Sequence, residues 1–209
     1  MVFSSKLIED AVQEFSRLPG IGKKTALRMV LHLLRLEKDQ VDQFTGALSR
    51  LRHDLQFCSS CHNVSDGPVC SICSNPGRNR TQICVVENLR DVIAIESTQQ
   101  FSGLYHVLNG ILSPLDGVGP DQLNINSLVD RVRNEGTEEL IMALSPNIEG
   151  DTTVYYIARQ FQDTPVRITT IARGISFGGD LEYADEMTLA RSIAKRLPVE
   201  NYVSIQHKA

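Results

Sequence analysis

The chain has 209 residues, of which 42% are hydrophobic and 22% charged, so it can form one large domain or two modest ones with a real core. Its formal net charge of −4 argues against a generally basic protein that coats nucleic acid, although a local basic patch is compatible with this total. No apolar run approaches the roughly 18 residues of a membrane span. We therefore expect a soluble cytoplasmic protein with no membrane partner.

The first part of the chain has the apolar spacing of helices. Apolar residues three and four apart predict a helix over residues 4–17, which the segment Leu18-Pro19-Gly20-Ile21-Gly22 ends. A second helix should begin near Lys23 and run through Leu36, and a third should span residues 40–56. Two helices joined by this Pro-Gly-Ile-Gly turn have the pattern of a helix-hairpin-helix, a module that binds DNA phosphates without recognising sequence.

Basic residues follow the glycine turn. Six basic residues and one acid lie between positions 17 and 38, and several share one helical stripe, namely Lys24, Arg28, His32 and Arg35. The opposite stripe is apolar and contains Leu27, Val30, Leu31 and Leu34. A solvated face of an ordinary amphipathic helix would show the same charges. The turn favours DNA binding instead. Its glycines permit the backbone to approach DNA closely, and the first-turn N–H groups of the second helix can bind a phosphate. The candidate DNA-binding residues are Lys23, Lys24, Arg28 and Arg35.

Four cysteines in the middle of the chain have the spacing C-x2-C-x8-C-x2-C. Each C-x2-C pair can turn back on one metal ion, so two pairs supply four thiolates for a closed tetrahedral site. Such a site has no position for water, and we predict one structural zinc ion per chain. Two disulfides of a secreted protein are the alternative, which is less favoured because a chain of this length does not need cross-links. The predicted ligands are Cys58, Cys61, Cys70 and Cys73. The fifth cysteine, Cys84, is expected in a buried strand.

After the cysteines, strand patterns alternate with helix patterns. The predicted strands are 83–86, 104–108, 139–144 and 166–172. The predicted helices are 89–97, 121–134, 151–161 and 185–197. This alternation implies an α/β fold with a mainly parallel sheet and helices on both of its faces. The expected organisation is a helical region over 1–56, a zinc module over 57–76, an α/β domain over 77–200 and a tail over 201–209.

Polar residues follow two of these strands. Glu87 ends the first strand, and the segment Ser145-Pro146-Asn147-Ile148-Glu149-Gly150-Asp151 follows the later one. This pair resembles the Toprim domain of topoisomerases and primases, where an acid ends the first strand and D-P-D-x-E-G-E follows the later one. The two Asp side chains of that pattern hold Mg²⁺ for phosphoryl chemistry. Here Ser145 and Asn147 stand in their places, and both are poor ligands for a hard cation.

The remaining carboxylates suggest another use for this region. Asp91 lies four residues after Glu87 on the next predicted helix, so the two can form one acidic patch with Glu149 that suits a basic partner. Glu87 and Glu149 could still hold a weak Mg²⁺ ion. Two-metal catalysis is not expected.

The helix-hairpin-helix, the four-cysteine module and the degenerate Toprim pattern occur in an order that resembles, essentially end to end, the RecR family of bacterial recombination mediators. Further segments fit that family, including Cys73-Ser74-Asn75-Pro76, Leu112 to Pro120 and Gly178 to Asp185. The resemblance implies a non-catalytic DNA-repair protein that acts with RecO and RecF to load RecA on single-stranded DNA. It also implies ring-shaped tetramers that encircle single- or double-stranded DNA, a nucleoid location, and docking of RecO at Glu87, Asp91 and Glu149.

Two other functions remain open at this point. The first is a Mg²⁺-dependent Toprim nuclease or primase-like enzyme, against which Ser145 and Asn147 argue. The second is a protein scaffold that uses the hairpin only for self-assembly. DNA binding by variants of Lys24 and Arg28 would distinguish the scaffold from a DNA-binding mediator.

Overall fold

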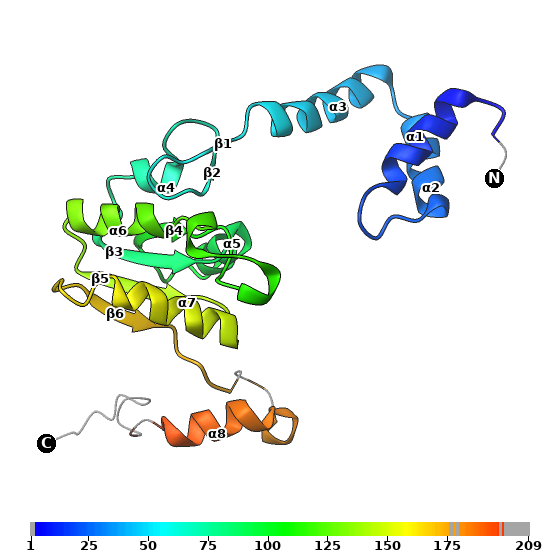
Figure 1. The fold of residues 1–209 in the computed structure, drawn as a ribbon. Helices are drawn as coiled ribbons and strands as arrows, with labels where there is room; N and C mark the ends of the chain where they lie inside the picture. The colour runs from blue at the N-terminus through cyan, green and yellow to red at the C-terminus, as the bar shows by residue number, and fades with distance from the viewer. Residues whose placement is uncertain (1–2, 176–177, 179, 197, 199–209) are drawn as a thin grey trace, which may run out of the picture. The chain divides into compact units, whose positions relative to one another are not determined.

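The computed structural model describes residues 3–175, 178, 180–196 and 198 (Figure 1). Contacts between residues divide the chain into two compact units, Met1–Leu55 and Gln56–Ala209. The cysteine-rich segment therefore belongs to the same unit as the strands that follow it. Within the described residues, no helix combines the length and the apolar composition that crossing a membrane requires.

The first unit is helical, as predicted, and contains α1 (Lys6–Ser16), α2 (Lys23–Leu33) and α3 (Lys38–His53). The turn between α1 and α2 includes Gly20, whose φ of 76° lies in the left-handed region that glycine enters without steric cost. The core of the unit is small and consists of Val12 from α1 with Ala26 and Val30 from α2. Helix α3 buries none of its side chains.

The prediction for the end of the second helix was wrong, because α2 ends at Leu33 rather than Leu36. The amides of Arg35 and Leu36 bond to carbonyls three residues earlier, which tightens the chain into a turn. Glu37 then begins α3, since its side chain and that of Gln40 form a capping box. Arg35 consequently lies beyond the helix and off the predicted basic stripe.

The apolar stripe predicted for α2 is only partly a core face. Val30 is buried and Leu27 is half-buried, whereas Leu31 and Leu34 are 44% and 63% exposed. Because α2 packs on α1 through Ala26 and Val30, the far end of the stripe is left open to solvent.

The second unit begins with the cysteine-rich module. Its elements are β1 (Gln56–Phe57), β2 (Val64–Ser65) and α4 (Ser71–Ser74). The strands pair antiparallel, with Phe57 opposite Val64. The third helix of the chain was predicted to reach residue 56, but it ends at His53 because Gln56 is already part of this ribbon.

The rest of the unit alternates strands and helices. Its elements are β3 (Asn79–Val86), α5 (Leu89–Ser97), β4 (Gly103–Val107), α6 (Ile125–Asn134), β5 (Glu139–Ala143), α7 (Ile148–Arg159), β6 (Arg167–Thr170) and α8 (Glu186–Ala194), with 3-10 turns at Pro114–Asp116, Pro120–Gln122 and Leu181–Tyr183. The four strands β3 to β6 form one sheet in the order β4-β3-β5-β6, and every pairing in it is parallel. The predicted parallel α/β fold is therefore confirmed.

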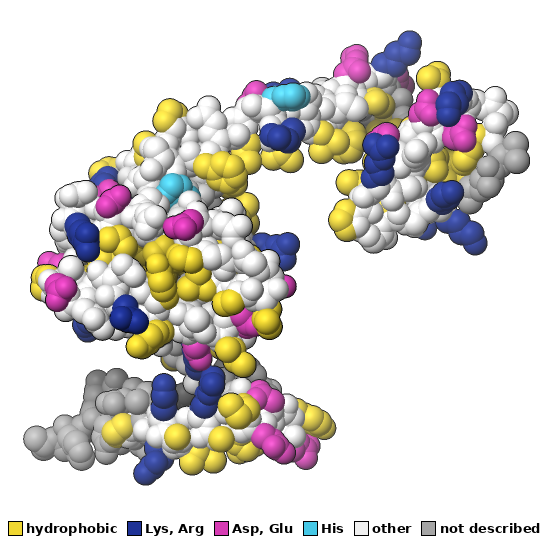
Figure 2. Space-filling model, in the orientation of Figure 1, with side chains coloured by type: hydrophobic (Ala, Val, Ile, Leu, Met, Phe, Trp, Pro, Cys, Tyr) yellow, Lys and Arg dark blue, Asp and Glu magenta, His cyan; other side chains and the backbone are white. Residues whose placement is uncertain are grey.

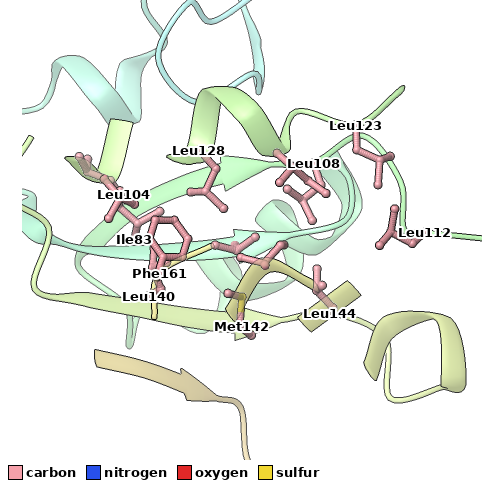
Figure 3. Close-up of a cluster of buried hydrophobic side chains, with 14 residues drawn as sticks. Ile83, Leu104, Leu108, Leu112, Leu123, Leu128, Leu140, Met142, Leu144 and Phe161 are labelled. Carbon is pink, nitrogen blue, oxygen red and sulfur yellow. The ribbon is translucent and has the colours of Figure 1, made fainter. Parts of the chain in front are cut away.

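Helices cover both faces of this sheet, as the alternation predicted. Ile83, Leu104 and Leu140 point to one face, where they meet Leu128 of α6 and Phe161 after α7 (Figure 3). Their sequence neighbours point to the other face, where Cys84, Val86, Tyr105 and Val107 pack with Val92 of α5. Adjacent residues of a strand point to opposite faces, so a strand buried on both sides is apolar throughout.

Several predicted boundaries shift because of local caps. Helix α7 begins at Ile148 rather than 151, since the Asn147 side chain accepts the N–H of Gly150 at 2.7 Å. Helix α6 begins at Ile125 rather than 121, after the 3-10 turn of Pro120–Gln122. Asp185 caps α8, which ends at Ala194. The predicted helix end at 197 and the tail at 201–209 lie outside the described residues.

Candidate zinc centre and binding surfaces

Two tight turns bring the predicted metal ligands together. The sulfur atoms of Cys58, Cys61, Cys70 and Cys73 all lie within 4.8 Å of one another, and the four residues are buried. Sulfur atoms on a tetrahedral zinc ion lie about 3.8 Å apart, given Zn–S bonds of about 2.3 Å. The five cysteines of the chain form no disulfide in the described structure. The four ligands thus form a closed structural zinc centre, and the disulfide alternative is wrong.

Backbone hydrogen bonds shape each turn. In the first, the N–H of Cys58 donates to the carbonyl of Asn63 at 2.7 Å, and His62 closes the turn with a φ of 60°. In the second, the N–H of Cys73 donates to the sulfur of Cys70 at 3.5 Å at the start of α4. N–H groups directed at sulfur stabilise thiolates, which are the form that binds zinc.

The module is attached to the sheet beside it. The N–H of Val107 at the end of β4 donates to the carbonyl of Cys61 at 2.8 Å. His62 Nε2 lies 2.8 Å from the hydroxyl oxygen of Ser127 on α6. The His62 ring also meets the His106 ring edge to face, with centroids 5.2 Å apart. The turn that contains Cys61 and His62 is therefore joined to β4 and α6 through short, direct contacts.

A buried arginine lies beside this attachment. Nη1 of Arg131 donates to the carbonyl of Tyr105 at 2.7 Å, and Nε donates to the carboxylate of Glu135 at 2.9 Å. Its Nη2 is buried and has no hydrogen-bond partner in the described structure. A buried cation with an unpaired donor fits a site that carries negative charge when zinc is bound, so the residues present fit the metal.

The arginine also affects nearby titratable groups. Burial, followed by the Arg131 charge, lowers the pKa of His62. Burial lowers the pKa of His106 to about 3, so this ring stays neutral. The pKa of Cys73 is lowered, first by a hydrogen bond with the Cys61 thiol and also by the positive charge of Arg131. Cys84, the cysteine outside the centre, is buried in β3, and burial raises its pKa to about 12.

The polar residues of the degenerate Toprim pattern meet at the carboxyl edge of the sheet. Val86 and Ala143 are register partners at the ends of β3 and β5, which places Glu87 next to Ser145. The Ser145 hydroxyl donates to the Glu87 carboxylate at 3.0 Å. Ser145 therefore forms a hydrogen bond with Glu87. In the Toprim pattern, the Asp at this position would instead share a cation with that carboxylate.

The other polar residues of this edge have structural partners. Asp91 accepts the backbone N–H groups of Glu87 and Asn88 at 3.1 and 3.0 Å, which caps α5. Asp151 pairs with Arg173 at 2.6 Å. Among the described residues, the four cysteines are the one group of three or more acidic, Cys or His side chains placed to share a metal ion.

Glycine at position 150 is required by the packing of this edge. A Cβ atom there would overlap the carbonyl oxygen of Ser145, so α7 could not begin so close to the end of β5. The same Ser145-to-Gly150 turn places Glu149, which is half-buried, at the first turn of α7.

The basic residues of the first unit are exposed around the start of α2. Lys23, Lys24 and Arg28 lie on the helix, and Lys24 and Arg28 are four residues apart on the same face. The N-cap residue Gly22 offers no side-chain acceptor, and the first turn of α2 contains no acid. Arg35 is exposed in the turn beyond α2, separated from the others by the end of the helix.

Sequence reasoning missed Arg131, His62 and His106 as neighbours of the zinc centre. Arg131 is far from the cysteines in the sequence, and only the packing of α6 against β4 brings it close. One signal was present, because the segment between Asp54 and Arg78 contains no Lys or Arg. A four-thiolate centre in such a segment has no Lys or Arg of its own to offset its negative charge.

Comparison with known families agrees with this architecture. A Toprim domain model matches residues 81–172. Models described as the RecR helix-hairpin-helix, the RecR four-cysteine zinc finger domain and the RecR C-terminal region match residues 8–52, 55–75 and 174–196. The fold and the site thus define a zinc-binding Toprim-domain protein with an N-terminal helix-hairpin-helix.

Individual relatives narrow this class to one family. Recombination protein RecR of Flavobacterium johnsoniae is 58% identical over 200 residues, covering 96% of this chain and 97% of the relative. The RecR proteins of Amoebophilus asiaticus and Flavobacterium psychrophilum are 55% and 57% identical and cover 94% and 96% of this chain and 98% of each relative. The chain belongs to the RecR family of recombination proteins.

Proposed function

We propose that this chain is a DNA-binding mediator of recombinational repair that acts with RecO and RecF to load RecA on single-stranded DNA. It works on the nucleoid in the cytoplasm and has no catalytic activity of its own. The observation that carries this proposal is the exposed, uncapped and basic start of α2 within a helix-hairpin-helix. Membership of a family of recombination proteins supports it.

DNA binding would use backbone and side chains together. The first-turn N–H groups of α2 have no capping side chain at Gly22, and the positive end of the helix dipole adds to the charges of Lys24 and Arg28. Lys23 is exposed beside them, and Arg35 contributes from the turn after the helix. Phosphate contacts carry no base information, so binding should tolerate any sequence, in single- and double-stranded DNA.

Docking of RecO would use the acidic edge of the sheet. Glu87 and Glu149 are half-buried carboxylates at the ends of adjacent strands, and Ser145 replaces the acid with which Glu87 would share a cation. Asp91 adds charge and fixes the backbone of Glu87. A basic partner could therefore pair with this patch without competing for a metal ion.

Assembly into a ring would use apolar residues that the first unit leaves exposed. Phe44, Leu48 and Leu51 follow one another at spacings of four and three along α3 and are 42%, 52% and 60% exposed. Hydrophobic side chains gather along α3 on the face drawn in Figure 2. A monomer rarely leaves such a stripe in water, so a second copy is the proposed occupant. In such a ring, the weak DNA contacts of the individual copies would together give tighter binding.

The direct test is DNA binding by the double variant Lys24→Ala/Arg28→Ala. The expected result is a loss of affinity of tenfold or more for labelled single-stranded DNA, with the same oligomeric state as the parent protein. Lys6→Ala is the matched control, because Lys6 is an exposed cation on α1 that pairs with Asp10 and lies away from the turn. Equal affinity of double variant, control and parent would favour the scaffold function over DNA binding.

A second test concerns catalysis. Loss of both Asp ligands at positions 145 and 147 leads us to expect no Mg²⁺-dependent nicking, cleavage or primer synthesis. Cleavage that persists through purification and disappears in Glu87→Gln would identify the Toprim edge as an active site and overturn this part of the proposal.

A further inference from the structure

The zinc centre lacks positive charge within its own module. Residues 55–77 contain no Lys or Arg, and the four ligands are buried. A zinc ion with four thiolates has a net charge of −2, which is costly to bury without a compensating charge. N–H groups reach the sulfur atoms of Cys58 and Cys70, but they supply only partial charges.

Three arginines of the same unit lie near the module and are candidates for the compensating charge. Arg78 is committed to the carboxylate of Glu96 and to the carbonyls of Phe101 and Gly103. Arg80 is exposed and donates to the backbone carbonyl of Cys73 at 3.1 Å. Arg131 differs from both, because its side chain is only 4% exposed. Solvent therefore screens its charge least.

The position of Arg131 follows from two elements that flank the cysteines. On α6 it lies one turn after Ser127, whose hydroxyl contacts His62, so both residues face the module. On β4 its Nη1 bonds to the carbonyl of Tyr105, two residues before Val107, whose N–H bonds to Cys61. Nη2 has no hydrogen-bond partner among the described residues.

We propose that Arg131 is the counter-charge of the zinc–thiolate centre and retains the metal from outside the zinc module. Its unpaired Nη2 and its burial are then explained by the charge that appears beside it when the four thiolates bind zinc. The same contacts would couple zinc occupancy to α6 and β4, so the module and the sheet would behave as one cooperative unit.

The alternative is a purely structural arginine that only connects Tyr105 to Glu135. Substitutions can separate the two roles. Arg131→Gln removes the charge, Arg131→Lys retains a charge without the forked geometry, and Glu135→Gln retains Arg131 while removing its ion-pair partner. If the charge of Arg131 retains the metal, Arg131→Lys and Glu135→Gln should keep zinc nearly as well as the parent. Arg131→Gln should lose it faster.

The experiment measures zinc transfer from the full-length folded protein to the chromogenic chelator 4-(2-pyridylazo)resorcinol, with the fold checked by circular dichroism. We expect Arg131→Gln to lose zinc at least tenfold faster than the parent, in the range of 10 to 100-fold typical for partners that surround metal ligands. We expect Glu135→Gln to match the parent or to lose zinc more slowly, and Arg131→Lys to stay within about threefold of it.

Three outcomes would overturn the proposal: parent-like zinc loss in Arg131→Gln, equal acceleration in Arg131→Gln and Arg131→Lys, or tenfold acceleration in Glu135→Gln. Should Arg131→Gln fail to fold, the other two variants still decide. Retention of zinc by both supports the counter-charge, and loss by Arg131→Lys contradicts it.

Discussion

In the unit Gln56–Ala209, two clusters of buried side chains cover both faces of a parallel sheet and a zinc centre is attached beside β4. In the unit Met1–Leu55, the described residues bury only Val12, Ala26 and Val30, and much of the apolar surface faces solvent. The comparison indicates that the second unit is stable through its own core, whereas the first unit leaves apolar residues exposed, where we propose that a second copy binds. The buried core of the second unit and the exposed apolar surface of the first are built from the same residue types. Only the burial of these residues distinguishes them.

The largest effect should come from removing the metal. Cys73→Ala should abolish stoichiometric zinc and raise amide exchange over residues 57–76 and in β4, because structural zinc sites supply about 10–16 kcal/mol of apparent binding free energy to folding. Exchange in α1 and α2 should not change, since they lie in the other unit. Hydrogen exchange read by mass spectrometry measures both units at once.

Cys84→Ala is the control for this prediction, because Cys84 is buried in β3 and is not among the grouped ligands. It should retain one zinc ion per chain. Stoichiometric zinc in Cys73→Ala, or unchanged exchange in β4 of the zinc-free protein, would contradict the link between metal and sheet.

A smaller contrast is expected from matched leucine substitutions. Leu140→Ala removes a fully buried side chain from β5 and should lower the free energy of unfolding of its unit by about 2–5 kcal/mol. Leu48→Ala on α3 should change the stability of the dilute protein by less than about 0.5 kcal/mol and should weaken self-association instead. Denaturant unfolding and sedimentation measure the two quantities. Similar losses of stability in both variants would remove the distinction between the units.

A third contrast lies within the acidic edge of the sheet. Asp91→Ala should destabilise the second unit by about 0.5–2 kcal/mol, because it removes the Asp91 half of the capping box that α5 forms with Asn88. Glu87→Gln should stay within about 0.5 kcal/mol of the parent, and Glu87→Lys should weaken binding to RecO. Thermal unfolding and a pull-down with purified RecO test these expectations. A stable Asp91→Ala protein would contradict the structural role of Asp91. Parent-like RecO binding by Glu87→Lys would contradict the docking role of Glu87.

Local patterns in the sequence predicted the features that depend on neighbouring residues. The spacing of Cys58 to Cys73 was sufficient for the metal ligands, since two short turns place all four sulfur atoms. The alternation after Cys73 predicted the parallel sheet, because strands buried on both faces are apolar throughout. Helix ends were less certain. The apolar periodicity of α2 continues past Leu33, where the helix ends before the cap at Glu37. The cap at Asn147 begins α7 three residues before the predicted start.

Features that depend on distant residues could not be predicted in this way. Periodicity showed that Leu31 and Leu34 share a face, but not that α1 leaves them uncovered. Arg131 is brought to the carbonyl of Tyr105 on β4 only by the fold, and its charge gave no local pattern in the sequence. Asp91 looked like a surface acid in the sequence, whereas its carboxylate bonds to two backbone N–H groups.

The most direct test of the account is the salt dependence of DNA binding by Lys24→Ala and Arg28→Ala, with assembly state measured in parallel. Each phosphate contact contributes about 0.7 to 0.9 to the slope of log affinity against log salt concentration. The account predicts a shallower slope for each variant, by at least this amount per DNA-contacting protomer, with the same preference among sequences and the oligomer intact. Parent-like affinity and slope in both variants, together with an intact oligomer, would contradict the claim that the first unit binds DNA through α2.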